Sequence, residues 1–441
     1  MRQVIAKKNY LLLHDDGTVH YPFSKFLTDE FNNPNTRDLV SQSLRILYRF
    51  NIAHEIELVV RAVEGRCLTY NECQNLVGLC YRPLGEVESL SSKKVVLLTS
   101  AKAGKPPKDR PNAIEPNTAK KRLIHIAQYL QFYFTVFLQP NIRSQTLCNN
   151  LRYAYENTTH ELLTKIRGTK QNHHHDIQSL PSTKFLQIIR AIFVRPEELF
   201  LNGSGHSSRT LKRDRSMALL ACEGLRPGTL GNITRSDYRP ASRHLVVKDN
   251  REKRNRTTSS TPVLKLGAST RCNSASEGMI ELWPFTVDAI NDYINTERTV
   301  ILSKHLKNRS KGFLFLNEKG EPIKHRASIS AMFHSLGNSL SELGLLDVGN
   351  DPYFFNQKKY GFYAYVLRHS SASFFLEANG TDNKTLERMR IRFGWTVNSK
   401  QPQRYAARAL SDKANIDLME FYERLMSEVK ERKKSWANNG L

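Results

Sequence analysis

The residues best suited to chemistry are two arginines, a tryptophan and a tyrosine in the second half of the chain. Arg226 follows the apolar segment MALLACEGL, Arg368 lies in VLRHSSAS, Trp395 closes RFGW, and Tyr405 follows a polar stretch. A guanidinium group is a planar fork that binds two phosphate oxygens at once and keeps its charge. A tyrosine oxygen can hold a phosphoryl group covalently, and an indole N–H donates hydrogen bonds. Together these groups could break and reform a phosphodiester bond without a metal ion or nucleotide.

Charge balance favours a polyanionic partner. The 441 residues include 66 Lys and Arg against 42 Asp and Glu, a formal net charge of +24. Such a field attracts nucleic acid or an anionic membrane surface. The longest apolar runs, Val95–Leu98 and Val136–Leu138, are too short to cross a membrane, and the N-terminal leucine run is too short for a signal peptide. We therefore expect double-stranded DNA as the partner, and no membrane.

Cysteine and histidine usage gives no sign of a metal site or cofactor. The six cysteines form no CxxC pair, which is typical of a reduced cytosolic chain. The run His173–His175 lies in a polar stretch, where adjacent side chains cannot all face one ion, so we expect a solvated linker.

The order of these segments resembles the catalytic domain of tyrosine recombinases, the phage-integrase-like site-specific recombinases. In that family a first arginine closes an apolar helix, a histidine-x-x-arginine box begins a later helix, a Leu-Gly-His/Trp box follows, and the nucleophilic tyrosine comes shortly after. The resemblance covers residues 115–410 and implies Tyr405 as the nucleophile among 17 tyrosines. It also implies Arg226 and Arg368 as the phosphate clamp. Trp395 stands where many members have a histidine, and its N–H could donate to phosphate.

Tyr365 is the main departure from the family pattern. It stands three residues before Arg368, where the family usually has a histidine that accepts a proton. A phenol has a pKa near 10 and is a poor base at neutral pH. The neighbouring His369 is not expected to replace it, because consecutive residues on a helix point about 100° apart. Thr229, three residues after Arg226, stands where the family commonly has an acidic residue, and this is a minor difference from the family pattern.

The resemblance implies a lysine in the β2–β3 region of a three-stranded sheet, as general acid for the departing 5′ oxygen. Lys265 fits the expected strand placement, Lys253 better fits the usual distance from Arg226, and Lys248 is a third candidate. Strand-like runs at residues 244–247, 262–266 and 279–285 would form the sheet.

Periodicity and composition predict a mainly α fold with a small antiparallel β-sheet (α+β). The expected organisation is an N-terminal extension of unknown role (residues 1–33), a helical core-binding domain with a basic, proline-rich insert (34–165), a linker (166–184), a catalytic domain (185–410) and a C-terminal helix (411–441). Asn117 and Thr286 are the predicted N-caps of two helices. The basic cluster at residues 120–122 is read as a solvated helix face, although the family clamps DNA with this domain.

The C-terminal helix has an apolar stripe with two readings. Its members are Leu418, Phe421, Tyr422, Leu425, Met426 and Val429. They either pack into the core of their own chain or, as the family resemblance implies, dock on a neighbouring protomer.

The sequence thus predicts a DNA strand transferase that works through a 3′-phosphotyrosyl intermediate, as in an integrase or transposase of a mobile element. The resemblance implies a homotetramer with a dimer on each DNA site, accessory DNA-bending or directionality proteins, and a cytoplasmic, nucleoid-associated location. A type IB topoisomerase and a catalytically inactive DNA-binding relative are the alternatives.

Overall fold

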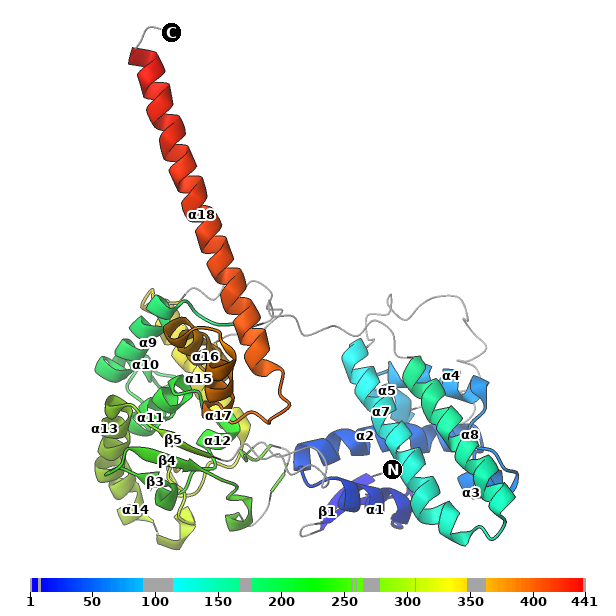
Figure 1. Cartoon of the computed structure of the whole chain (residues 1–441). Coiled ribbons are helices and arrows are strands. Elements are labelled where there is room, and N and C mark those ends of the chain that lie inside the picture. The colour runs from blue at the N-terminus through cyan, green and yellow to red at the C-terminus, as the bar shows by residue number, and fades with distance from the viewer. Residues whose placement is uncertain are drawn as a thin grey trace. The chain divides into compact units, whose positions relative to one another are not determined.

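The computed structural model describes residues 2–6, 9–89, 114–165, 177–254, 257–258, 260–264, 278–305, 307–346 and 362–438. They form two compact units: an N-terminal unit within Met1–Gln171 and a C-terminal unit that holds the described residues from 177 onward. Both units are mainly helical, and each contains one small antiparallel sheet (Figure 1). The predicted fold class, mainly α with a small antiparallel sheet, is confirmed. Lys265 and His173–His175 lie outside the described residues.

The N-terminal unit packs its helices around α2 and α7. Its elements are the hairpin β1 (Arg2–Ala6) and β2 (Asn9–Leu13), and helices α1 (Tyr21–Glu30), α2 (Pro34–Ala53), α3 (Leu58–Val63), α4 (Tyr70–Cys80), α5 (Leu84–Ser89), α7 (Pro116–Tyr133) and α8 (Gln145–Thr164). Leu44 and Leu47 of α2 and Leu123 and Leu130 of α7 are fully buried in one cluster.

The first 33 residues are part of this unit rather than a separate extension. Phe23, Phe26 and Leu27 of α1 are buried in the same core, and the Phe26 ring lies 5.5 Å from that of Tyr129 on α7. Hydrophobic burial of this kind ties the segment to the rest of the unit.

Arg122 is a buried structural residue, which differs from the expected solvated basic face. Its Nη1 donates to the carbonyl oxygens of Cys80 and Arg82, at 3.0 and 2.6 Å. The predicted cap at Asn117 is also wrong by two positions. Helix α7 begins at Pro116 with Glu115 as its N-cap, because proline suits a first turn whose N–H groups have no helical partner.

The C-terminal unit surrounds α11 with helices and places a three-stranded sheet beside them. Its helices are α9 (Ser182–Val194), α10 (Pro196–Leu199), α11 (Leu211–Cys222), α12 (Pro227–Leu230), α13 (Pro284–Tyr293), α14 (Thr299–Lys304), α15 (Arg326–Glu342), α16 (Ala364–Asn379), α17 (Asn383–Arg392) and α18 (Gln401–Asn438). The described end of the predicted linker, from Ile177, packs onto this unit, where Leu180 N–H donates to Ser370 Oγ at 2.9 Å.

The sheet has the order β3–β4–β5 with antiparallel pairing, formed by Tyr238–Arg239, His244–Val247 and Gly278–Glu281. The run at 244–247 is confirmed as a strand. The run at 262–266 is not one over its described residues 262–264, and Tyr238–Arg239 supplies the third strand instead. The predicted strand at 279–285 stops early because α13 begins at Pro284, with Trp283 rather than Thr286 as its N-cap.

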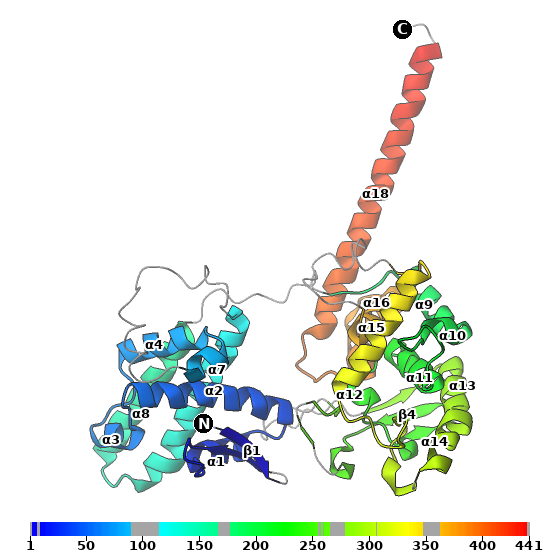
Figure 2. The same ribbon diagram turned by 180° about the vertical axis from the view of Figure 1, so that it is seen from behind.

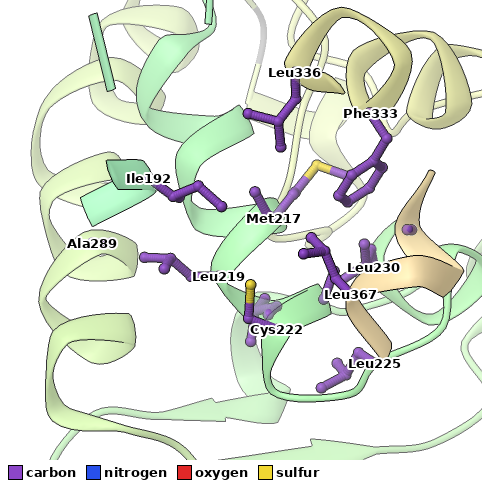
Figure 3. Close-up of a cluster of buried hydrophobic side chains, with 14 of the residues drawn as sticks. Ile192, Met217, Leu219, Cys222, Leu225, Leu230, Ala289, Phe333, Leu336 and Leu367 are labelled. Carbon is purple, nitrogen blue, oxygen red and sulfur yellow. The ribbon is translucent and has the colours of Figure 1, made fainter. Parts of the chain in front are cut away.

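Helix α11 is the centre of the larger core. Residues 216–222 are all fully or almost fully buried. Figure 3 shows Met217 beside Phe333 and Leu336 of α15, and Leu219 between α11 and α13. Truncating such a side chain to alanine typically costs about 2–5 kcal/mol. The core therefore fixes where α11 ends, and with it the turn that carries Arg226.

Tyr405 lies on the C-terminal helix, which begins earlier than predicted. Helix α18 begins at Gln401, ten residues before the expected C-terminal helix, and runs to Asn438. Figures 1 and 2 show that it extends well away from the rest of the C-terminal unit. Its described side chains from Lys413 to Glu431 are all exposed, including the whole apolar stripe. The reading of this stripe as part of the chain's own core is wrong.

Candidate active site

Arg226 and Arg368 reach the same short backbone segment from different elements. Helix α11 ends at Cys222, and Gly224, two residues later, has φ of +93°, so that Arg226 follows as the N-cap of α12. Arg226 Nη2 lies 3.5 Å from Gly394 O, and Arg368 Nη2, from α16, donates to Phe393 O at 2.7 Å. The two guanidinium groups therefore contact consecutive carbonyl groups.

Position 224 requires glycine because of one close contact as well as its backbone angle. Its carbonyl oxygen accepts a hydrogen bond from Arg368 Nη1. A Cβ at this position would lie 2.5 Å from Cε1 of Phe393. Any side chain here would therefore push apart the helix end and the segment that the arginines share.

The two arginines form a cationic pair in which Arg368 is buried and Arg226 is partly buried. Arg368 is 4% exposed. Burial, followed by the nearby charge of Arg226, lowers the pKa of Arg368 to about 9, and burial lowers the pKa of Arg226. Within the described part of the chain, neither arginine forms an ion pair with a carboxylate. The adjacent buried carboxylate, Glu223, is held by Arg392 Nη2 at 2.7 Å and by the N–H of Trp283 at 2.6 Å.

Buried cations without a counterion are costly unless a ligand supplies the negative charge. A small cleft lies against this pair. It is lined by the α11–α12 turn, by Val247, Gly278 and Ile280 of the sheet, and by Arg392–Gly394 at the end of α17. The arrangement is suited to an anion such as a phosphate.

Trp395 and Tyr405 form an aromatic stack beside the arginines. The Trp395 ring lies 5.2 Å from that of Phe393 and 5.5 Å from that of Tyr405, with interplanar angles of 20° and 27°. The Arg368 guanidinium carbon lies over both the Phe393 and Trp395 rings, at 5.3 and 5.4 Å. One stack thus positions both the phenol and the guanidinium group.

Tyr405 has a buried hydroxyl group with a histidine partner. Tyr405 is 2% exposed, and its hydroxyl hydrogen-bonds to Nδ1 of His369 on α16. Burial lowers the pKa of His369 to about 4, with Arg368 and Arg404 adding to the effect. Burial also raises the pKa of Tyr405 to about 12, although Arg368 opposes this. At neutral pH the hydroxyl therefore donates and the neutral imidazole accepts.

His369, which the sequence did not predict as a replacement for the missing histidine, is the hydrogen-bond partner of Tyr405. Helix α18 packs against α16 and so brings Tyr405 to His369. Pro402 is the sequence signal for this arrangement. Proline is common in the first turn of a helix, so Pro402 would have predicted a helix that contains Tyr405.

No known protein-family model matches the sequence, and neither does any curated protein. The chain is similar to solved structures of the Tn1549 transposon integrase in complex with DNA. The complex with transposon right end DNA has a TM-score of 0.37 and 13% identity, over 78% of this chain and 99% of that one. A complex with a circular intermediate DNA gives the same TM-score and identity, over 79% and 100%. These values mark a distant likeness, and the chemistry of the site follows from its own side chains.

Tyr365 lies at the rim of the site. It is 39% exposed, and its ring lies 6.1 Å from that of His369 and 6.2 Å from that of Tyr363. It also lines a separate hollow with Pro227, the residue after Arg226. It is therefore accessible from solvent, unlike Tyr405.

The two candidate lysines that the structure describes, Lys248 and Lys253, do not lie beside the arginine pair. Lys248 Nζ forms an ion pair at 3.0 Å with the buried Asp237, and Lys253 is exposed in the short 3₁₀ helix Arg251–Lys253. Neither lines the cleft beside Arg226 and Arg368. The third candidate, Lys265, lies outside the described residues.

Among the described residues, no group of three or more His, Cys, Asp or Glu side chains could hold a metal ion. No described helix combines the length and hydropathy needed to span a membrane. The described cysteines, Cys67, Cys73, Cys80, Cys148 and Cys222, are buried free thiols.

Proposed function

We propose that this protein is a DNA strand transferase of the tyrosine-recombinase type. The observation that carries the proposal is the meeting of three groups at residues 393–395: the Arg226 and Arg368 guanidinium groups and the Tyr405 phenol. The cationic pair supplies fixed charge for a phosphate, and the phenol supplies a nucleophile beside it. The net charge of +24 supports DNA as the molecule that carries that phosphate.

In the proposed reaction, the Tyr405 oxygen attacks the scissile phosphorus and forms a 3′-phosphotyrosyl bond. The bond to the 5′ oxygen breaks, and that oxygen takes up a proton from a lysine or water. Arg226 and Arg368 stabilise the extra negative charge on the non-bridging oxygens. In this proposal, Tyr365 and the Trp395 N–H donate hydrogen bonds to the same phosphate. Attack by a 5′-hydroxyl group on the phosphotyrosine rejoins the strand.

For the general acid we keep Lys253 and Lys265 as the candidates. Lys253 is exposed on a short helix between β4 and β5, and movement of this segment on DNA could bring it to the phosphate. Lys248 is the weaker choice because Asp237 already holds its ammonium group.

The finer proposal is an integrase or transposase of a mobile element that recombines two DNA sites. The N-terminal unit, with residues 1–33 included, would clamp DNA together with the C-terminal unit. The exposed stripe of α18 would dock on another copy of the chain and connect active sites in a tetramer, with a dimer on each site. Accessory DNA-bending proteins and a nucleoid-associated, cytoplasmic location belong to the same proposal.

A type IB topoisomerase would use the same chemistry on a single duplex. The two functions differ in whether the protein pairs two DNA sites of defined sequence. Sites can be selected by this protein from a random-sequence duplex pool and then joined in a plasmid. Exchange between the paired sites supports a recombinase, whereas relaxation of plasmids regardless of site supports a topoisomerase.

The covalent step itself is tested with a nicked suicide substrate built on a selected site. Cleavage releases the short fragment between the cleavage point and the nick, which carries the free 5′-hydroxyl group. Its loss prevents rejoining and traps the adduct. We expect a protein–DNA adduct that survives denaturant and is linked through Tyr405. Specific binding without any adduct would instead identify a catalytically inactive DNA-binding protein.

A further inference from the structure

We propose that His369 is the proton acceptor for Tyr405 and that bound DNA activates it. The proposal rests on the proposed function and assigns to His369 the role that the histidine-x-x-arginine pattern would give to position 365. Its basis is direct contact: Nδ1 of His369 is the hydrogen-bond partner of the Tyr405 hydroxyl. In the proposed reaction that hydroxyl oxygen is the attacking atom.

The surroundings of His369 fix its ring in place. It lies on α16, one residue after Arg368, and is partly buried between α16 and α18. Its ring centroid lies 5.7 Å from that of Tyr405 and 6.1 Å from that of Tyr365. Tyr405 is in turn held by its stack on Trp395. The donor and acceptor are therefore both oriented before any substrate arrives.

Tyr365 is a poor alternative for this role. Its side chain is exposed at the rim, and a phenol at neutral pH gives up a proton far less readily than an imidazole takes one. It remains suited to donating a hydrogen bond to phosphate. His369 thus accepts the proton that a histidine at position 365 would accept in the family pattern.

In this proposal, the positive charge around His369 makes it a weak proton acceptor in the free protein. The titratable and charged groups that face it are Arg368 and Tyr365 on its own helix and Arg404 and Tyr405 on α18. The two arginines disfavour an imidazolium ion. A phosphate bound by Arg226 and Arg368 would offset this positive charge and make the imidazole a better base. Tyr405 would therefore become nucleophilic only when a scissile phosphate is bound.

The proposed step balances without any further reactant. The proton of the Tyr405 hydroxyl moves to His369 Nδ1 as the phenolic oxygen bonds to phosphorus. The phosphorus–5′-oxygen bond breaks, and the 5′ oxygen receives a proton from a lysine or water. In the reverse step, the incoming 5′-hydroxyl group gives its proton to the lysine or to water and displaces the phenolate, which recovers its proton from His369.

The test compares wild type, His369→Asn and His369→Gln on two suicide substrates under single-turnover conditions. One substrate has the natural 5′ oxygen, and the other has sulfur in the bridging 5′ position. A thiolate leaves without protonation, since a thiol is far more acidic than an alcohol, so the second substrate reports on activation of the nucleophile alone. Both variants keep a polar group beside Tyr405 but cannot take up a proton near neutral pH.

We expect both variants to form the adduct about 100-fold or more slowly on both substrates, as is typical for loss of a general base. The wild-type rate should rise with pH through the pKa of DNA-bound His369, and this rise should be absent from both variants. DNA affinity and the thermal unfolding midpoint should stay close to wild type. His206→Asn, at an exposed turn, is the matched control and should react like wild type.

The outcomes separate this proposal from the proposed function. A wild-type adduct together with variants that keep the wild-type rate and pH profile would overturn the role of His369 alone. A defect confined to the oxygen substrate would also overturn it, because that pattern indicates an acid for the leaving group. If wild type forms no adduct with either substrate, the proposed function fails and this inference fails with it.

Discussion

Arg368 and Arg226 contact consecutive carbonyl groups, those of Phe393 and Gly394, at 2.7 and 3.5 Å. This relationship places two guanidinium groups from separate elements side by side, at the end of α17. Because the backbone segment continues directly into Trp395, on which Tyr405 stacks, it also sets the position of the nucleophile. The charge and the phenol are therefore parts of one assembly.

Replacing Arg226 should affect chemistry much more than affinity. Arg226→Ala removes one of two cations that act on the transition state, and we expect adduct formation to slow by about 100- to 1,000-fold. DNA affinity should change by only a few fold, because Arg226 is one of 66 lysine and arginine residues that could contribute to binding. Arg226→Lys keeps the charge but loses the fork, so it should remain clearly impaired. Equal losses in affinity and in rate would contradict a role in the transition state.

Gly224→Ala should disturb the site through its geometry. The added Cβ would overlap the Phe393 ring, and the backbone angle of +93° is strained for alanine. We expect a loss of about 1–3 kcal/mol in the free energy of unfolding and a large loss of adduct formation. Gly205→Ala is a matched control, because φ there is +76° with no heavy atom within 4 Å of the added Cβ. Gly205→Ala should lower the free energy of unfolding through a similar backbone strain, which denaturant unfolding measures. It should leave adduct formation intact, which gel analysis measures.

The apolar stripe of α18 should matter for assembly rather than for folding. Phe421 and Leu425 are exposed in the single chain, so Phe421→Glu with Leu425→Glu should leave the unfolding midpoint nearly unchanged. If the stripe docks on another copy, the double variant should shift the DNA complex from tetramer to smaller species in sedimentation experiments. Glu420→Lys with Glu423→Lys is a control for surface charge on the same helix. An unchanged assembly state in the stripe variant would rule out this docking role.

DNA binding should weaken steeply with salt. With a net charge of +24, the protein is expected to displace many counterions from DNA. A plot of log affinity against log salt concentration should have a slope steeper than about −4, which corresponds to roughly five or more phosphate contacts. A nearly flat plot, measured by fluorescence anisotropy, would contradict a polyanionic partner.

The local features of the fold were predictable where the signal lies within a few residues. The end of α11 follows from an apolar segment that meets Gly224, and that end places Arg226. The strand at 244–247 follows from its short run of β-branched and apolar residues. Pairing partners are set by distant contacts, however, and this is why Tyr238–Arg239 was missed as the third strand.

The site was predicted in part for the same reason. The sequence identified Arg226, Arg368, Trp395 and Tyr405, and the structure brings them together, but their catalytic roles remain a proposal. The contact between His369 and Tyr405 was not predicted, because it depends on where α18 packs, which no pattern around residue 369 reveals. Likewise, the stripe on α18 indicated an apolar contact without saying which surface provides it.

The most direct measurement is the trapped adduct on a nicked, selected DNA site, compared between wild type and Tyr405→Phe. The substitution removes one hydroxyl group and its hydrogen bond to His369, so it should lower the free energy of unfolding by only about 1 kcal/mol. The account predicts a covalent adduct for wild type, mapped to Tyr405 by mass spectrometry of the attached nucleotide, and full DNA binding without adduct for Tyr405→Phe. An adduct of equal yield with Tyr405→Phe, or its attachment to another residue, would contradict the account.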